Sequence, residues 1–235
     1  MTTIVLVHGL WSDGSSWARV ITELRAMGHE PVAAQLALES MDDDVASVRR
    51  TLATVSGPLL LVGWSYGGAV IGEAARGVAA VNALAYVAAF APAEGESVSG
   101  LSRKYPGSEI PKHVVVAGDY TYINRATFGE LLAADAPAES VAIAAATQKM
   151  VRIGLDRVKV NPPAWLDLPS HYLLTTDDRC VPPELQREMA ARMGAVVTET
   201  DSSHAPLLSR PREVADFLDG ACRNMMTTNP QESTE

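Results

Sequence analysis

The chain has 235 residues, of which 47% are hydrophobic and 20% are charged, and its formal net charge is −9 at pH 7. This length and apolar content predict one globular domain with a substantial core. The acidic balance, with no basic cluster, argues against nucleic acid and anionic membranes as partners, and no apolar run approaches the ~20 residues that span a bilayer.

Apolar strands and helical patterns alternate along the chain. Strands are predicted near residues 3–7, 30–35, 59–63, 83–90, 171–176 and 195–199. Helices are predicted near residues 15–27, 42–55, 65–79, 183–193 and 211–222. The alternation predicts an α/β fold with a mainly parallel sheet of about six strands and helices on both faces. Asp42, Asp43 and Asp44 begin one of the helices, where carboxylates favour the positive end of the dipole, so we expect no metal there.

The third predicted strand runs directly into a Gly-x-Ser-x-Gly turn. The residues are Gly63-Trp64-Ser65-Tyr66-Gly67, and a helical pattern follows. A serine on such a sharp strand-to-helix turn projects its hydroxyl where a base and a substrate can reach it. A side chain at Gly63 or Gly67 would collide with neighbouring backbone in so tight a turn. This context predicts that Ser65 is a nucleophile.

The loop after the first strand, His8-Gly9-Leu10-Trp11, is a candidate oxyanion-binding segment. Acyl transfer usually needs two backbone amides that stabilise a developing oxyanion. One comes from the residue after the nucleophile, here Tyr66, and the other from a loop after an early strand. We expect the second amide to be that of Leu10, with Trp11 as the alternative. His8 is expected to bond loop backbone and to transfer no proton.

The base and the acid should follow Ser65, because the chain order in this architecture is serine, acid, histidine. His204 lies in a polar loop after a short strand, where open α/β sheets carry their chemistry, whereas His171 begins an apolar run at the wrong end of a strand. We therefore predict His204 as the base.

Two adjacent carboxylates, Asp177 and Asp178, follow the strand near residues 171–176. Successive side chains that leave a strand point in opposite directions, so only one of them is expected to reach His204. We favour Asp178. The alternatives are Asp177 and, beyond the neighbouring strand, Glu94.

These segments resemble the α/β-hydrolase superfamily, most closely its branch of small esterases and hydroxynitrile lyases. The resemblance runs from Thr3 to about Ala221. It rests on Val7-His8-Gly9, Gly63-Trp64-Ser65-Tyr66-Gly67-Gly68, Ala89-Phe90-Ala91-Pro92, Asp178-Arg179-Cys180-Val181-Pro182-Pro183 and Ser203-His204-Ala205-Pro206.

The resemblance implies an α/β-hydrolase fold and a triad of Ser65, Asp178 and His204. In the family pattern the acid stands four residues before the first proline of its segment, a spacing that favours Asp178. The family's oxyanion donors correspond to Leu10 and Tyr66. One departure is Trp64, where many members carry histidine, and we expect it to reshape the wall behind the nucleophile without disabling the triad.

The alternation of strands and helices breaks between Pro92 and Pro169, a stretch too long for a plain connection. We interpret residues 92–169 as a lid inserted into a core of residues 1–91 and 170–223, with residues 224–235 as a disordered tail. A mostly apolar pocket is expected beneath the lid. Its predicted lining is Trp11, Phe90, Tyr120, Tyr122, Phe128, Met150 and Trp165.

The sequence thus predicts a serine carboxylesterase that acts on a small to mid-sized, largely apolar ester. A lyase that uses the same triad for proton transfer is the first alternative, with Lys149, Arg152 and Lys159 as candidate cationic lid residues. A catalytically silent ligand-binding homologue is the second.

We expect a small-molecule substrate, no metal and no organic cofactor, and the oligomeric state is open between monomer and homodimer. Cys180 and Cys222 match no metal or disulfide pattern and are read as reduced thiols. The first predicted strand begins at Thr3, which leaves no room for a signal peptide, so the expected compartment is the cytoplasm.

Overall fold

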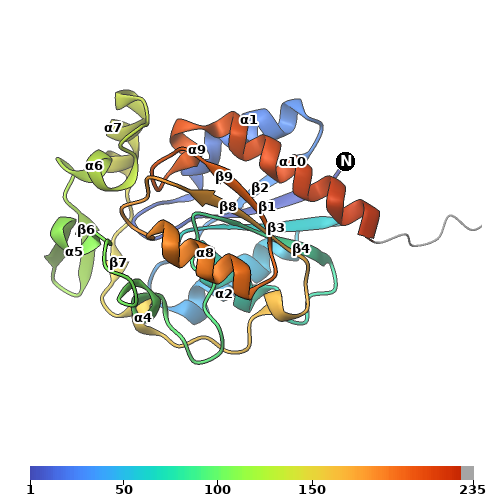
Figure 1. Cartoon of the computed structure of the whole chain (residues 1–235), viewed down its shortest axis with the longest axis horizontal. Helices are drawn as coiled ribbons and strands as arrows, with labels where there is room; N and C mark the ends of the chain where they lie inside the picture. The colour runs from blue at the N-terminus through green and yellow to red at the C-terminus, as the bar shows by residue number, and fades with distance from the viewer. Residues whose placement is uncertain (229–235) are drawn as a thin grey trace, which may run out of the picture.

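The computed structural model describes residues 1–228 and contains a central sheet of six strands (Figure 1). The strands are β1 (Thr3–Val7), β2 (Glu30–Ala34), β3 (Leu59–Trp64), β4 (Val81–Val87), β8 (Ser170–Thr175) and β9 (Val196–Thr200). Their order is β2-β1-β3-β4-β8-β9, and every neighbouring pair is parallel. The predicted parallel sheet is therefore confirmed.

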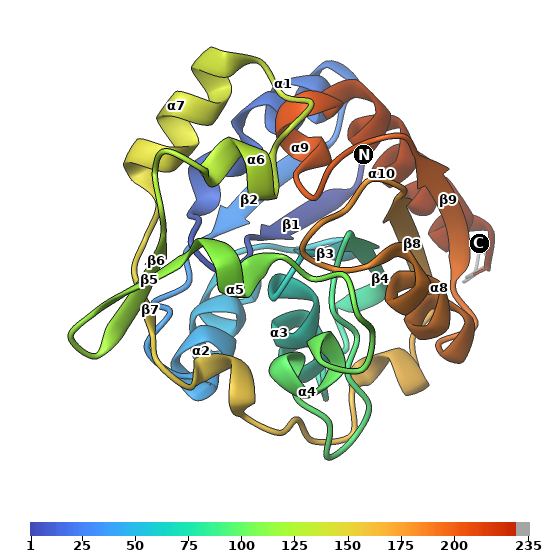
Figure 2. The ribbon, with the colours of Figure 1, turned by 60° about the vertical axis from the view of Figure 1, so that its left-hand side comes forward.

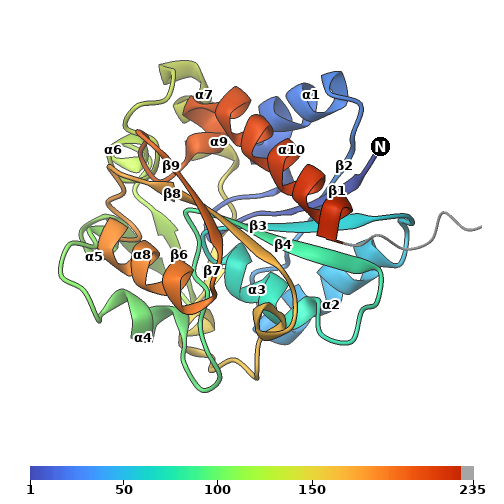
Figure 3. The same cartoon turned by 45° about the vertical axis from the view of Figure 1, so that its right-hand side comes forward.

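Helices cover both faces of this sheet. They are α1 (Ala18–Ala26), α2 (Met41–Leu52), α3 (Gly67–Ala74), α8 (Pro183–Arg192), α9 (Pro206–Ser209) and α10 (Pro211–Thr228), with a 3-10 turn, η1 (Gly14–Trp17), before α1. Figure 3 shows α1 and α10 side by side on one face and α2, α3 and α8 on the other. Because both faces are covered, every residue of β1, β3 and β8 is buried.

The last helix is longer than the sequence predicts. It continues to Thr228, so residues 224–228, which we expected in a disordered tail, are helical. Met225 continues the apolar face of the helix and is buried in the core, which supports the extension. Residues 229–235 of the predicted tail lie outside the described residues.

Residues 92–169 form a separate set of elements between β4 and β8. These are α4 (Val98–Ser102), α5 (Ile110–His113), β5 (Val114–Ala117), β6 (Tyr120–Ile123), α6 (Phe128–Leu132), α7 (Ala138–Thr147), β7 (Val151–Arg152), and the 3-10 turns η2 (Leu155–Arg157) and η3 (Ala164–Leu166). Strands β5, β6 and β7 pair antiparallel in a small second sheet. Figure 2 shows α5 and α6 near the ends of β1 and β2, at the carboxyl edge of the main sheet. That this segment acts as a lid stays a prediction.

None of the helices within residues 1–228 combines the length and the apolar character that crossing a bilayer requires.

Candidate active site

Ser65 stands at a sharp turn between β3 and α3. Its φ is +56°, in the left-handed region that a non-glycine residue rarely adopts. A Cβ added to Gly63 would lie 2.5 Å from the Gly67 carbonyl oxygen, and one added to Gly67 would lie 2.6 Å from the Val7 carbonyl oxygen. Both positions therefore need glycine, and the close packing around them holds the strained turn in place.

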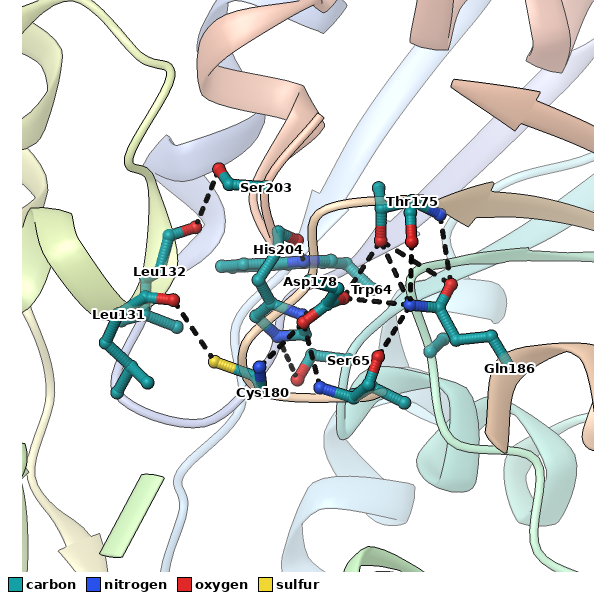
Figure 4. Close-up of polar contacts among 12 residues, drawn as sticks. Trp64, Ser65, Leu131, Leu132, Thr175, Asp178, Cys180, Gln186, Ser203 and His204 are labelled. Atoms are coloured by element: carbon teal, nitrogen blue, oxygen red, sulfur yellow. Dashed lines mark hydrogen bonds and ion pairs between the residues drawn. The ribbon is translucent and has the colours of Figure 1, made fainter. Parts of the chain in front are cut away.

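Three side chains from distant parts of the sequence form one hydrogen-bonded line (Figure 4). The His204 ring lies between the other two: its Nε2 is 2.9 Å from Ser65 Oγ, and its Nδ1 is 2.8 Å from Asp178 Oδ2. His204 and Asp178 are both buried. The three residues follow β3, β8 and β9, whose carboxyl ends meet at one edge of the parallel sheet.

The two other carboxylates lie apart from this line. Asp177 is exposed, and its backbone N–H donates to the Ser202 carbonyl. Glu94 is also exposed and does not line the cavity that contains Ser65. The structure therefore brings Asp178, and not Asp177, to His204, and the opposite directions of successive side chains explain why only one of the two does.

The Asp178 carboxylate accepts five hydrogen bonds. Oδ1 accepts the backbone N–H groups of Cys180 and Val181, each at 2.8 Å. Oδ2 accepts from Thr175 Oγ1 at 2.9 Å, from Gln186 Nε2 at 3.0 Å and from the histidine ring. A buried charge needs such partners, because an unpaired one would be costly to remove from water.

Trp64 contacts His204 through both its indole N–H group and its ring. Its indole Nε1 donates to the backbone carbonyl of His204 at 2.8 Å, and the two ring centroids are 5.5 Å apart. The residue was expected only to shape the wall behind Ser65. Its bond to a loop 140 positions away is not visible in the local sequence.

Of the two proposed oxyanion donors, Leu10 and Tyr66, only Leu10 is among the residues that line the cavity at Ser65. Leu10 lines the same cavity as Ser65 and His204, as does Trp11. Among residues 1–228, neither the Leu10 amide nor the Tyr66 amide donates to another protein group. The Tyr66 side chain points into the core, where its hydroxyl donates to Asp44 Oδ2 at 2.9 Å. Because neither backbone amide has an acceptor within the described residues, both can donate to a ligand.

His8 bonds the loop backbone, as predicted. Its Nε2 accepts the Leu36 N–H at 3.0 Å, so the ring proton sits on Nδ1, which lies 2.9 Å from the Gly9 carbonyl oxygen. Burial lowers the pKa of His8 to about 4. The ring is therefore neutral near neutral pH and has a structural role.

A cavity of about 210 Å³ opens at Ser65. Two of the predicted lining residues, Trp11 and Phe90, do line it. The remaining wall residues are Leu10, Val98, Ser99, Ser102, Arg103, Ile110, Pro111, Leu132, Asp156 and Cys180. Half of these residues, which were not predicted to line the cavity, lie on α4 and α5, where the sequence predicts no helix. A local signal exists for α4, because Ser97 caps it by accepting the Gly100 N–H at 3.2 Å.

Three of the predicted lining residues belong to the small sheet or to the surface. Tyr120 and Tyr122 lie on β6, and the guanidinium groups of Arg152 and Arg125 stack on their respective rings. Met150 is 44% exposed. None of the three lines the cavity, so these assignments are wrong: arginine contacts and solvent, not the cavity, surround the side chains.

Phe128 and Trp165 are buried but also lie away from the cavity. Phe128 begins α6 and packs in the core. Trp165 donates from Nε1 to the Pro92 carbonyl at 3.3 Å, with Arg192 stacked on its ring. Their assignment to the pocket is wrong, because an aromatic residue in an insertion suits a core as well as a pocket wall.

The end of α6 contacts the loops that carry Asp178 and His204. The Leu131 carbonyl accepts from Cys180 Sγ at 3.6 Å, and the Leu132 carbonyl accepts from Ser203 Oγ at 3.5 Å (Figure 4). The inserted segment therefore touches the chain two residues after Asp178 and one residue before His204.

Within residues 1–228, one group of three potential metal ligands is close together: Asp178, Cys180 and His204. Burial raises the pKa of the Cys180 thiol well above its usual value, so the sulfur is protonated at neutral pH and is a poor ligand. The carboxylate and imidazole already bond one another.

The three cations named for a lyase lie outside the cavity. Lys149 donates to the Leu36 carbonyl, Arg152 forms an ion pair with Asp119 at 3.3 Å, and Lys159 is exposed. The cation that does line the cavity is Arg103, which the sequence analysis did not single out.

The comparisons agree with this geometry. A sequence model described as "Alpha/beta hydrolase family" matches residues 4–217. Esterase PIR7B of Oryza sativa subsp. japonica is 27% identical over 252 residues, which cover 91% of this chain and 93% of that protein. A pyrethroid hydrolase of Sphingobium wenxiniae is 26% identical, with 97% and 91% covered.

Among solved structures, a pyrethroid hydrolase of Sphingobium faniae JZ-2 superposes with a TM-score of 0.81 at 23% identity, over 94% of this chain and 97% of that one. The structural match shows a shared fold. Because the family match spans most of the residues that form the sheet and the Ser65 site, the chain belongs to the alpha/beta hydrolase family.

Proposed function

We propose that this protein hydrolyses carboxylic esters, with Ser65 as the nucleophile. The observation that carries the proposal is the unbroken line from Ser65 Oγ through the His204 ring to Asp178, at 2.9 and 2.8 Å, at the wall of a cavity. The similarity to an esterase and to pyrethroid hydrolases supports ester chemistry.

The proposed reaction has two halves. His204 Nε2 takes the proton of the Ser65 hydroxyl while Oγ attacks the ester carbonyl carbon. Asp178 holds the ring in the tautomer with the proton on Nδ1 and stabilises the cation that forms. The negative charge moves to the carbonyl oxygen, where the amides of Leu10 and Tyr66 would donate to it. The tetrahedral intermediate collapses, and the alcohol leaves with the proton from His204.

Water then completes the cycle. His204 removes a proton from the water, whose oxygen attacks the acyl carbon, and the acid leaves as Oγ recovers its proton. The steps need no metal or organic cofactor. Lys149, Arg152 and Lys159 do not line the cavity, but Arg103 does, so the position of a cation does not separate the esterase from the lyase alternative; covalent capture of Ser65 and a burst of alcohol do.

The cavity indicates the kind of ester. Its volume of about 210 Å³ is small for a ligand site, and most of its wall is apolar. We infer that neutral esters with a short apolar acyl or alcohol group fit best, since Arg103 and Asp156 together give the wall no net positive charge to offset the hydration that an anion would lose.

The test uses the full chain and a series of p-nitrophenyl esters of increasing acyl length. Esterase action predicts a burst of p-nitrophenol, a preference for short acyl chains, and covalent capture of Ser65 by a serine-reactive phosphonate, located by peptide mass spectrometry. Ser65→Ala is the matched control. Turnover without capture of Ser65, or no turnover of any ester, would contradict the proposal.

A further inference from the structure

Gln186 lies on α8, and its side-chain amide is fully buried beside Asp178. Glutamine is rarely buried completely, because its amide needs partners for two donor hydrogens and an oxygen. Here the partners lie on the segment 175–181, which carries Asp178 (Figure 4).

The hydrogen bonds determine which way the amide points. Oε1 lies 3.1 Å from the backbone nitrogen of Thr175, which can only donate, so this atom is the oxygen. Nε2 lies 2.8 Å from the carbonyl oxygen of Val181, which can only accept. The same Nε2 is 3.0 Å from both Asp178 Oδ2 and Thr175 Oγ1, so its second N–H group faces the carboxylate and is shared with the threonine hydroxyl.

Asp178 Oδ2 is also the atom that faces His204 Nδ1, at 2.8 Å. Thr175 Oγ1 donates to it as well, at 2.9 Å. Two neutral donors on the protein side therefore fix the position of the one oxygen that orients the base. The backbone donors of the loop fix the other oxygen, Oδ1.

We propose that Gln186, together with Thr175, is a positioning residue for the reaction: it holds Asp178 Oδ2 in line with the base and selects Asp178 over the adjacent Asp177. The inference rests on the proposed function, since it concerns the acid of that site. It assigns a role to a residue that touches neither the substrate nor the reacting atoms.

Gln148 provides a matched control. Its amide also bonds backbone on both sides, accepting the Ile123 N–H at 2.9 Å and donating to the Ile123 and Ala145 carbonyls at 3.0 Å each. These bonds lie in the inserted segment and include no residue of the Ser65 site. Gln148→Met removes three hydrogen bonds and Gln186→Met removes six, and only Gln186→Met removes a donor to Asp178.

The experiment measures kcat and KM for a p-nitrophenyl ester, thermal unfolding, and the low-field proton resonance of the Nδ1–H group that bonds Asp178. For Gln186→Met we expect kcat to fall about 10- to 100-fold, the rate equivalent of one hydrogen bond to a charged group, with KM within about twofold. The resonance should move or broaden. Gln148→Met should lower the unfolding temperature and leave kcat and the resonance unchanged.

Thr175→Val and Thr175→Ser keep the test usable if Gln186→Met does not fold. Thr175→Val removes the hydroxyl that donates to Asp178 and accepts from Gln186, so kcat should fall and the resonance should change, while Thr175→Ser should restore both. If Gln186→Met or Thr175→Val loses only stability, as Gln148→Met does, the proposal is overturned. The resonance reports the bond between Asp178 and His204 whether or not the ester is a substrate, so failure of the inference is distinct from failure of the proposed function.

Discussion

Replacing Asp178 by asparagine exchanges one oxygen for an NH₂ group, and the structure determines which one. Oδ1 accepts two backbone N–H groups at 2.8 Å, whose directions are fixed, whereas the Thr175 and Gln186 donors to Oδ2 lie on side chains that can rotate. The amide oxygen of asparagine would therefore take the place of Oδ1. The NH₂ group then occupies the position of Oδ2 and faces His204 Nδ1, which must accept a hydrogen bond instead of donating one. The ring proton moves to Nε2, which faces Ser65 Oγ and can no longer take its proton.

The expected loss follows from this exchange of tautomer. A triad with the wrong tautomer loses about 10⁴-fold in kcat, equivalent to about 5 kcal/mol of barrier. KM should change little, because Asp178 does not line the cavity. Asp177→Asn is the matched control, since its exposed side chain makes no contact with the base.

The assay is steady-state hydrolysis of a p-nitrophenyl ester by both variants and the unmodified chain, with thermal unfolding to confirm that each is folded. A loss of less than about tenfold for Asp178→Asn, or an equal loss for Asp177→Asn, would refute the assignment of the acid and the tautomer argument with it.

Three further predictions concern neighbouring positions. Ser65→Ala and Ser65→Gly should both abolish ester turnover. The free energy of unfolding of Ser65→Gly should be about 1 kcal/mol higher than that of Ser65→Ala, because glycine adopts the φ of +56° without strain. Urea titration measures the difference, and equal stabilities would contradict it. Trp64→Phe removes the donor to the His204 carbonyl and keeps an aromatic ring, so kcat should fall about tenfold at unchanged KM. An unchanged kcat would show that packing alone positions His204. The pKa of His8 is about 4 in the folded chain and has its ordinary value of 6.5 in the unfolded chain, so the unfolded chain takes up a proton first as the pH falls. The folded state should therefore lose about 2 kcal/mol of stability between pH 7 and pH 5. Urea titration of the unmodified chain against His8→Gln, which does not titrate, should show this difference, and identical pH dependence would contradict it.

Local patterns were sufficient to predict the sheet and the sharp turn at Ser65. Continuous apolar runs such as Leu59 to Val62 predict buried parallel strands, because a strand covered on both faces has no polar side. The glycines beside Ser65 predict the sharp turn, because no Cβ fits there. The order of serine, acid and histidine then places the three residues at one edge, since the strands that precede them run parallel.

The surroundings of these residues were not predictable in the same way. Gln186 and Trp64 act through contacts with segments that lie far away in the sequence or on another element, and no periodicity marks a residue for such a bond. The inserted segment showed the largest difference. Tyr122 and Trp165 were expected in the pocket, but the wall consists of side chains such as Val98, Ile110 and Leu132.

The sequence by itself determined the strands and the sharp turn at Ser65, because these depend on interactions between residues a few positions apart. The tertiary structure alone decided which of two adjacent aspartates reaches the base and which apolar side chains face the cavity. An apolar side chain gains about the same free energy from burial in a core as in a pocket wall, so hydrophobicity cannot distinguish the two; only the path of the chain over Ser65 does.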